Sequence, residues 1–177
     1  MKYMQGLFSN RKHFVILSAI VFIAIILRIY TFSGFIGLDD AEYARFAYQI
    51  TQGTFNISGY NGPPVFPLRI GIIFPVSISF KLFGISEWSM VLYPLIISII
   101  SIFLVYYAAA YLFSSRAGLI AAFLFALLPI DLINSTRLLP DLPAAFFASL
   151  GVVCILPVFN SSSMQQRYLP LGAGFVG

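Results

Sequence analysis

The sequence has 177 residues, of which 60% are hydrophobic and only 9% are charged. A soluble domain carries about 25% charged residues, so the composition excludes an ordinary soluble domain and indicates an integral membrane protein. The formal net charge of +4 does not indicate a nucleic-acid partner, because in a membrane chain the position of each basic residue matters more than the sum.

The chain begins with a short basic segment, MKYMQGLFSNRKHF, that leads into an apolar run over residues 14–36. About 20 apolar residues are enough to cross a bilayer as a helix. A basic leader before an apolar core also fits a signal peptide, but the apolar run continues past Arg28 and no small-x-small cleavage site ends it. We therefore expect a first membrane span here, interrupted only by Arg28.

A long loop follows, from about residue 34 to residue 87, and it contains two helical patterns. The first covers residues 40–52, where apolar side chains recur at helical spacing between polar ones. These apolar residues are Tyr43, Phe46, Ala47 and Ile50. Gly53 is a typical helix end, and an amphipathic pattern beside a span predicts a helix that lies on the membrane surface.

The second pattern lies after the turn cluster GYNGPP at residues 59–64. Residues 68–83 are apolar, but Arg69 and Lys81 bound this stretch and Pro75 breaks it. Its uncharged core is too short to cross a bilayer. We therefore expect a second interfacial helix here and not a span.

Three further spans are expected in the rest of the chain. Residues 88–113 contain no charged side chain and form the clearest span, whereas residues 117–134 and 141–159 are shorter and each has an aspartate near one end. The single cysteine, Cys154, excludes an internal disulfide. A new apolar segment opens at Tyr168, so we interpret residues 1–177 as the N-terminal part of an all-α, polytopic bundle of transmembrane helices whose C-terminal remainder is absent.

Acidic and basic residues fall on opposite sides of these spans. Basic loops stay in the cytoplasm, so we place the N-terminus inside, together with Lys2, Arg11, Lys12, Arg116 and Arg167. The opposite side then holds all 6 carboxylates, which are Asp39, Asp40, Glu42, Glu87, Asp131 and Asp141, and also Arg45, Arg69, Lys81 and Arg137. Any acid chemistry is therefore expected on the extracytoplasmic face.

Asp39 is the carboxylate with the clearest chemical role. It lies near the first span and in front of an amphipathic helix, where desolvation would raise its proton affinity and suit it to general-base catalysis. Asp40 and Glu42 have a simpler explanation, because a carboxylate at a helix N-terminus complements the helix dipole. Asp141 has the same alternative, since it follows Pro140 at an expected helix start.

Two other charged residues lie near Asp141 in the sequence. Arg137 precedes this aspartate by four residues and could pair with it. Asp131 comes just after Pro129 at the end of the third expected span. We interpret Asp131 as a boundary residue.

The order of these segments resembles that of a known family of membrane enzymes. The segments are LDDAEYARFAYQITQGTF in the first outer loop, PPVFPLRIGIIFPVSISFKLFGISEWSMVLYPLIISII after it, and YLFSSRAGLIAAFLFALLPIDLINSTRLLPDLPAAFFASLG around the third and fourth spans. Behind a short basic N-terminus and one span, this ordered set is similar to the N-terminal part of the GT-C membrane glycosyltransferases. The most similar branch contains the dolichyl-phosphate-mannose protein mannosyltransferases and the lipid A aminoarabinose transferase.

The resemblance implies an inverting glycosyltransferase that moves a sugar from a polyprenyl phosphate to an extracytoplasmic protein, lipid or glycan. The family's first acidic motif is usually Asp-Glu followed by a tyrosine, and these positions fall on Asp39, Asp40 and Tyr43. Asp40 departs from the family's glutamate, which keeps the charge but shortens the reach. Asp141, after RLLP, matches the second acidic position. Asp39 is thus expected to be catalytic, and Asp40, Tyr43 and Asp141 to bind substrate.

Inversion also needs positive charge that stabilises the departing phosphate. Arg69, Arg137 or Lys81 could supply it, and we count the two arginines as substrate-binding because guanidinium groups suit phosphate oxygens. Interfacial anchoring by snorkelling is the alternative for all three. The sequence identifies no certain cofactor, and the resemblance leaves open a divalent cation, Mg²⁺ or Mn²⁺, between Asp39 and Asp141.

The resemblance places the protein among the lipids of a prokaryotic plasma membrane, with its active site on the extracytoplasmic face. A transporter or channel subunit is an alternative, and it would place ionisable groups near the middle of its helices. Only Arg28 approaches such a position. A non-catalytic membrane scaffold is a third interpretation.

Overall fold

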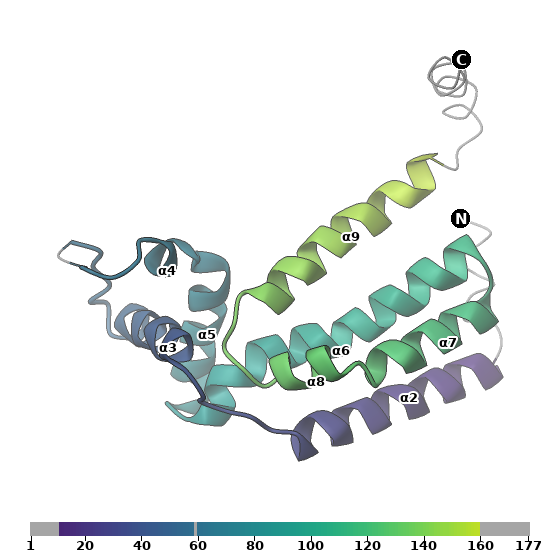
Figure 1. Ribbon diagram of the computed structural model, residues 1–177, viewed down its shortest axis with the longest axis horizontal. Coiled ribbons are helices and arrows are strands. Elements are labelled where there is room, and N and C mark those ends of the chain that lie inside the picture. Colours follow the sequence, from purple (N-terminus) through teal and green to yellow (C-terminus); the bar gives the residue numbers. More distant parts are fainter. Residues whose placement is uncertain (1–10, 59, 160–177) are drawn as a thin grey trace, which may run out of the picture.

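The computed structural model describes residues 11–58 and 60–159, and within these ranges the chain forms helices and no strand (Figure 1). The helices are α2 (Arg11–Tyr30), α3 (Leu38–Thr51), α4 (Val65–Leu68), α5 (Ile70–Phe83), α6 (Glu87–Leu112), α7 (Ser115–Ala126), α8 (Pro129–Asn134) and α9 (Asp141–Phe159). The all-α fold class is therefore confirmed. Lys2, Arg167 and the apolar segment expected from Tyr168 lie outside the described residues.

The helices α2, α6 and α7 lie side by side and form the main bundle, and α9 packs on the other side of α6 (Figure 1). Their shared core consists of Leu17, Ile20, Ala24, Ile102, Tyr106, Ala122 and Ala126. Gly118 lets α7 approach α6 closely, because a Cβ at this position would lie 2.8 Å from the backbone oxygen of Tyr106. Small residues at such contacts are typical of membrane bundles.

Two described helices, α2 and α6, are long and apolar enough to cross a membrane, by length and composition. The bounds of α6 agree with the span expected at residues 88–113, and those of α9 agree with residues 141–159. The first span was expected over residues 14–36, but the observed helix stops before residue 36. Its helix ends at Tyr30, and Gly34 then turns the chain with a φ of 64°.

The span expected at residues 117–134 is divided into two helices. α7 ends at Ala126 and α8 begins at Pro129, and Leu128 between them has an extended conformation with φ −65° and ψ 116°. Proline disfavours the helical conformation in the preceding residue and suits the first position of a helix. Pro129 therefore separates the two helices, and α8 contacts α2 through Asp131.

The long loop between α2 and α6 folds into α3, α4 and α5 at one end of the bundle (Figure 1). The helices expected at residues 40–52 and 68–83 correspond to α3 and α5. They share a buried core made of Tyr43, Phe46, Ala47, Ile72, Ile73, Val76, Phe80, Met90, Val91 and Leu138. Because Met90 and Val91 belong to α6 and Leu138 precedes α9, this core attaches the loop helices to the bundle.

Helix α5 has one face toward the protein and one face away from it. Phe74, Ile78 and Leu82 recur every four residues and are all exposed. An exposed apolar stripe on a helix of a membrane protein is suited to contact with lipid. α5 thus presents an exposed apolar stripe on one face, and the apolar face of α3 packs against its other face.

Candidate functional site

Asp40 connects the start of α3 to the loop before α9. Its side chain is fully buried, with an exposed fraction of 0%. One carboxylate oxygen accepts hydrogen bonds from the backbone N–H groups of Ile36 (3.2 Å) and Gly37 (3.0 Å), and the other accepts from the N–H of Leu138 (3.0 Å). A buried charge is tolerated when it has such partners. The carboxylate that the resemblance assigns to substrate binding is therefore already bonded to backbone N–H groups of the protein.

A second set of contacts holds the same two segments together. Thr136 accepts a hydrogen bond through its side-chain oxygen from the N–H of Ser33 (3.0 Å) and through its carbonyl from the N–H of Gly34 (3.1 Å). Thr136 is fully buried. The segment before α3 and the loop between α8 and α9 thus form one unit.

Asp39 is exposed, unlike its neighbour Asp40. Among the described residues, none forms a hydrogen bond or an ion pair with its carboxylate. Asp39 lies at the edge of a groove of about 810 Å³ between α3 and the segment before α4. The protein alone does not desolvate this carboxylate, so any desolvation comes from the bilayer or from a bound substrate.

Tyr43 and Arg69 form a pair beside Asp39. The buried hydroxyl of Tyr43 accepts a hydrogen bond from a guanidinium nitrogen of Arg69. Burial raises the pKa of Tyr43, the hydrogen bond and positive charge of Arg69 lower it, and the negative charges of Asp39 and Asp141 raise it further. The net direction is upward, so the phenol stays protonated at neutral pH. The two carboxylates, which are distant in sequence, both lie close enough to influence this hydroxyl.

The three candidate phosphate ligands occupy different positions. Arg69 is exposed and beside Tyr43, whereas Lys81 lies 12 residues further along, at the other end of α5 and about 18 Å away at 1.5 Å per residue. Arg137 does not pair with Asp141 as expected. Its nearest carboxylate is that of Asp40, at 3.4 Å, and its Nε is buried without a partner among the described residues.

Asp141 is the first residue of α9, as the sequence predicted, and its side chain is exposed. It lines a pocket of about 270 Å³ between α6, α8 and α9. The other residues of this pocket are Ser101, Leu104, Val105, Phe125, Leu128, Ile130, Asp131, Asn134, Leu142, Ala145, Phe146 and Ser149. The pocket is thus mostly apolar, with a carboxylate at a helix N-terminus on its edge.

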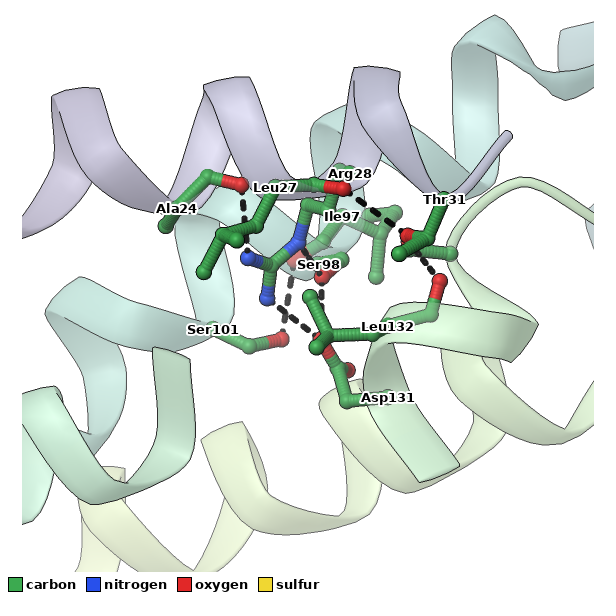
Figure 2. A network of polar contacts seen from close by, with 10 residues as sticks. Ala24, Leu27, Arg28, Thr31, Ile97, Ser98, Ser101, Asp131 and Leu132 are labelled. Atoms are coloured by element: carbon green, nitrogen blue, oxygen red, sulfur yellow. Dashed lines mark hydrogen bonds and ion pairs between the residues drawn. The ribbon is translucent and has the colours of Figure 1, made fainter. Parts of the chain in front are cut away.

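A buried ion pair between α2 and α8 was not expected from the sequence (Figure 2). A guanidinium nitrogen of Arg28 lies 2.5 Å from Asp131, and Ser98 on α6 accepts from Arg28 (2.7 Å) and donates to Asp131 (2.5 Å). The remaining guanidinium nitrogen donates to the carbonyl of Ala24 at 3.1 Å. Asp131 is therefore a partner of Arg28 inside the bundle and not a boundary residue. In the sequence, Arg28 was the signal for such a pair, because a charged residue inside a membrane span usually pairs with another group.

The described residues include no group of three or more His, Cys, Asp or Glu side chains that could hold a metal ion. Asp39 and Asp141 would supply only two carboxylate ligands to a metal ion. Mg²⁺ is commonly bound by one or two carboxylates together with the phosphate of a substrate. A cation between Asp39 and Asp141 would therefore need the donor phosphate as a further ligand.

An all-helical membrane bundle with exposed carboxylates and an exposed arginine at one end fits the class of membrane glycosyltransferases. The family model of dolichyl-phosphate-mannose-protein mannosyltransferase matches residues 62–177. The chain belongs to this family and is an integral membrane protein of the mannosyltransferase type of glycosyltransferase. The matched region contains Arg69, Arg137 and Asp141, whereas Asp39 and Tyr43 precede it. No curated protein and no solved structure matches the chain.

Proposed function

We propose that the protein is an inverting glycosyltransferase that moves a sugar from a polyprenyl phosphate to an acceptor hydroxyl on the extracytoplasmic face. The observation that carries the proposal is the contrast between two adjacent aspartates. Asp40 is buried and fully bonded, whereas Asp39 is exposed and has no hydrogen-bond partner among the described residues. The charge of Asp39 acts on the hydroxyl of Tyr43, which is the partner of Arg69, so a carboxylate and a guanidinium lie in the same region and supply the two groups that this reaction needs.

In the proposed reaction, Asp39 is the general base. Its carboxylate takes the proton of the acceptor hydroxyl while the acceptor oxygen forms a bond to the anomeric carbon of the donor. The bond between this carbon and the phosphate oxygen breaks, and the electron pair leaves with the polyprenyl phosphate. Attack and departure on opposite sides of the carbon invert its configuration.

Arg69 is the proposed ligand of the departing phosphate. Its guanidinium uses one nitrogen on Tyr43 and is otherwise exposed, so further N–H groups can meet phosphate oxygens. Arg137 contributes more weakly, because it is directed toward Asp40. The apolar pocket beside Asp141 suits the first part of the prenyl chain, since its walls are aliphatic and aromatic side chains.

One observation could favour a transporter as the alternative function. This observation is the charged pair inside the bundle, Arg28 and Asp131. Ionisable groups between spans often mark an ion pathway. Here, however, each guanidinium nitrogen of Arg28 donates a hydrogen bond within the protein, and Asp131 is 7% exposed. A fully bonded and enclosed pair is typical of a structural role, so the glycosyltransferase is the better supported function.

The anomeric configuration of the product tests the proposal. The protein is purified, reconstituted in liposomes and supplied with polyprenyl-phosphate mannose of known configuration, with water or an added alcohol as acceptor. NMR of the early product should show the configuration opposite to that of the donor. Retention of configuration, or no consumption of the lipid donor, would contradict the proposal.

A further inference from the structure

The groove beside Asp39 extends well beyond this residue. One wall is the face of α3 that carries Asp39, Glu42, Arg45 and Gln49, and the other wall is formed by residues of the segment before α4. The second wall contributes Asn56, Ser58, Tyr60, Asn61, Gly62 and Pro63, and Phe66 of α4 and Leu38 at the start of α3 complete the lining. The groove shares no lining residue with the apolar pocket beside Asp141. The two hollows therefore offer different surfaces to two different ligands.

The lining of the groove is more polar than that of the pocket beside Asp141, and it is nearly neutral. Two carboxylates, Asp39 and Glu42, and one guanidinium, Arg45, give a net charge of −1. Glu42 and Arg45 neutralise each other at 2.8 Å. A phosphate group would find no free cation here, because Arg45 is the single basic residue of the lining and is already paired. An uncharged ligand is therefore favoured.

The polar groups of the groove suit a ligand with many hydroxyl groups. Gln49, Asn56 and Asn61 carry amides, each of which can both donate and accept hydrogen bonds. Tyr60 and Phe66 add aromatic surface for the C–H face of a sugar ring. Planar amides beside aromatic rings are thus the chemistry that would recognise a saccharide. A peptide would instead be expected to use a sheet edge or a groove with apolar anchor pockets.

Gln49 gives the most specific indication of a ligand. The side-chain oxygen of Gln49 is buried and has no hydrogen-bond partner among the described residues. Buried polar atoms are normally bonded, so an unpartnered oxygen on a side chain that lines a groove is a candidate acceptor for a donor group of a ligand. Asp39 and Gln49 are ten residues apart on α3, about 15 Å at 1.5 Å per residue. A ligand that touches both is longer than one sugar ring.

We infer that this groove binds the acceptor, and that the acceptor is an uncharged oligosaccharide. Its reacting hydroxyl lies at Asp39, and a hydroxyl of a more distant sugar ring donates to the side-chain oxygen of Gln49. The inference rests on the proposed function, because Asp39 marks the reacting end only if it is the general base. It adds the chemical class of the acceptor and the residues that select for its length.

Binding and transfer are measured with mannotriose, methyl mannoside and a serine-containing peptide as probes. Saturation-transfer NMR on the protein in nanodiscs should show contact with mannotriose in the absence of any donor. In the transfer assay with polyprenyl-phosphate mannose, Gln49→Leu should raise the KM for mannotriose about three- to tenfold, which is the loss of one hydrogen bond. The kcat and the KM for methyl mannoside should stay unchanged.

Gln52→Leu is the matched control, because Gln52 follows α3, is exposed and does not line the groove. It should leave every constant unchanged. Asn61→Ala on the opposite wall provides a second variant, should Gln49→Leu fold poorly, and should weaken mannotriose binding. Absence of mannotriose contacts, equal effects of Gln49→Leu and Gln52→Leu, or transfer to the peptide alone would overturn the inference. Consumption of the lipid donor in water is scored separately, so a failed acceptor assignment is distinguished from a failed donor assignment.

Discussion

The carboxylate of Asp40 accepts a hydrogen bond from the backbone N–H of Leu138 at a distance of 3.0 Å. This contact joins two segments that are separated by three helices of the outer loop and three of the bundle. It brings Asp39, one residue before Asp40, to the same end of the molecule as Asp141, three residues after Leu138. We therefore propose that Asp40 positions the site and that Asp39 carries out its chemistry.

Asp40→Ala should destabilise the protein strongly. The substitution leaves the N–H groups of Gly37 and Leu138 without acceptors and Arg137 without its carboxylate. Loss of a buried charged partner of this kind costs about 3 kcal/mol. The measurement is the thermal unfolding midpoint in detergent, with Glu87→Gln as the control for loss of an exposed carboxylate. An unchanged midpoint together with a raised donor KM would instead mean that Asp40 contacts substrate.

The pair of Arg28 and Asp131 gives a second prediction about stability. Arg28→Met alone leaves a buried carboxylate uncompensated and should cost about 3–5 kcal/mol, and Asp131→Leu should cost a similar amount. The double variant should recover much of this loss, because no buried charge remains. A double-mutant cycle on unfolding free energies measures the coupling. Strictly additive losses would show that the contact contributes nothing to the fold.

The sequence predicted the helices of the outer loop because their patterns are local. Tyr43, Phe46 and Ala47 mark the buried face of α3 by spacing alone, and the apolar stretch around Pro75 became α5. The break between α7 and α8 also had a local signal in Pro129. The high hydropathy of residues 117–134 as a whole outweighed that signal and led to the prediction of a single span.

The partners of buried charges could not be predicted in the same way. Nothing near Asp40 in the sequence indicates the N–H of Leu138, and nothing near Arg28 indicates Asp131. These contacts depend on how α8 turns after Pro129, which is a tertiary property. The motif of the resemblance indicated two adjacent aspartates, and their difference in burial is the basis for the separate roles that we propose for them.

Membrane topology is tested by labelling single cysteines from outside intact cells. In a Cys154→Ala background, a cysteine at Asn56 should react with an impermeant maleimide and a cysteine at Ser115 should not. The expectation follows from the basic residues near the N-terminus and at Arg116, which favour the cytoplasm. Labelling of position 115 alone would reverse the orientation and remove Asp39 from the extracytoplasmic face.

Arg69 and Lys81 form a matched pair of cations at the two ends of α5. Arg69→Gln should lower kcat for transfer from polyprenyl-phosphate mannose by about 10²-fold, because it removes charge stabilisation of the departing phosphate. Lys81→Gln should have little effect, since Lys81 lies about 18 Å away at 1.5 Å per residue. Equal effects of the two substitutions would mean that α5 contributes only general positive charge.

The most direct test of the account compares sugar transfer by Asp39→Asn with transfer by Glu87→Gln in reconstituted liposomes. Asp39 is exposed and has no partner among the described residues, so the Asp39→Asn variant should fold and bind the donor like the wild type. Loss of a general base should nevertheless lower kcat by about 10²–10⁴-fold, whereas Glu87→Gln should retain normal kcat. Near-normal transfer by Asp39→Asn, with donor binding intact, would contradict the assignment of Asp39 as the catalytic base.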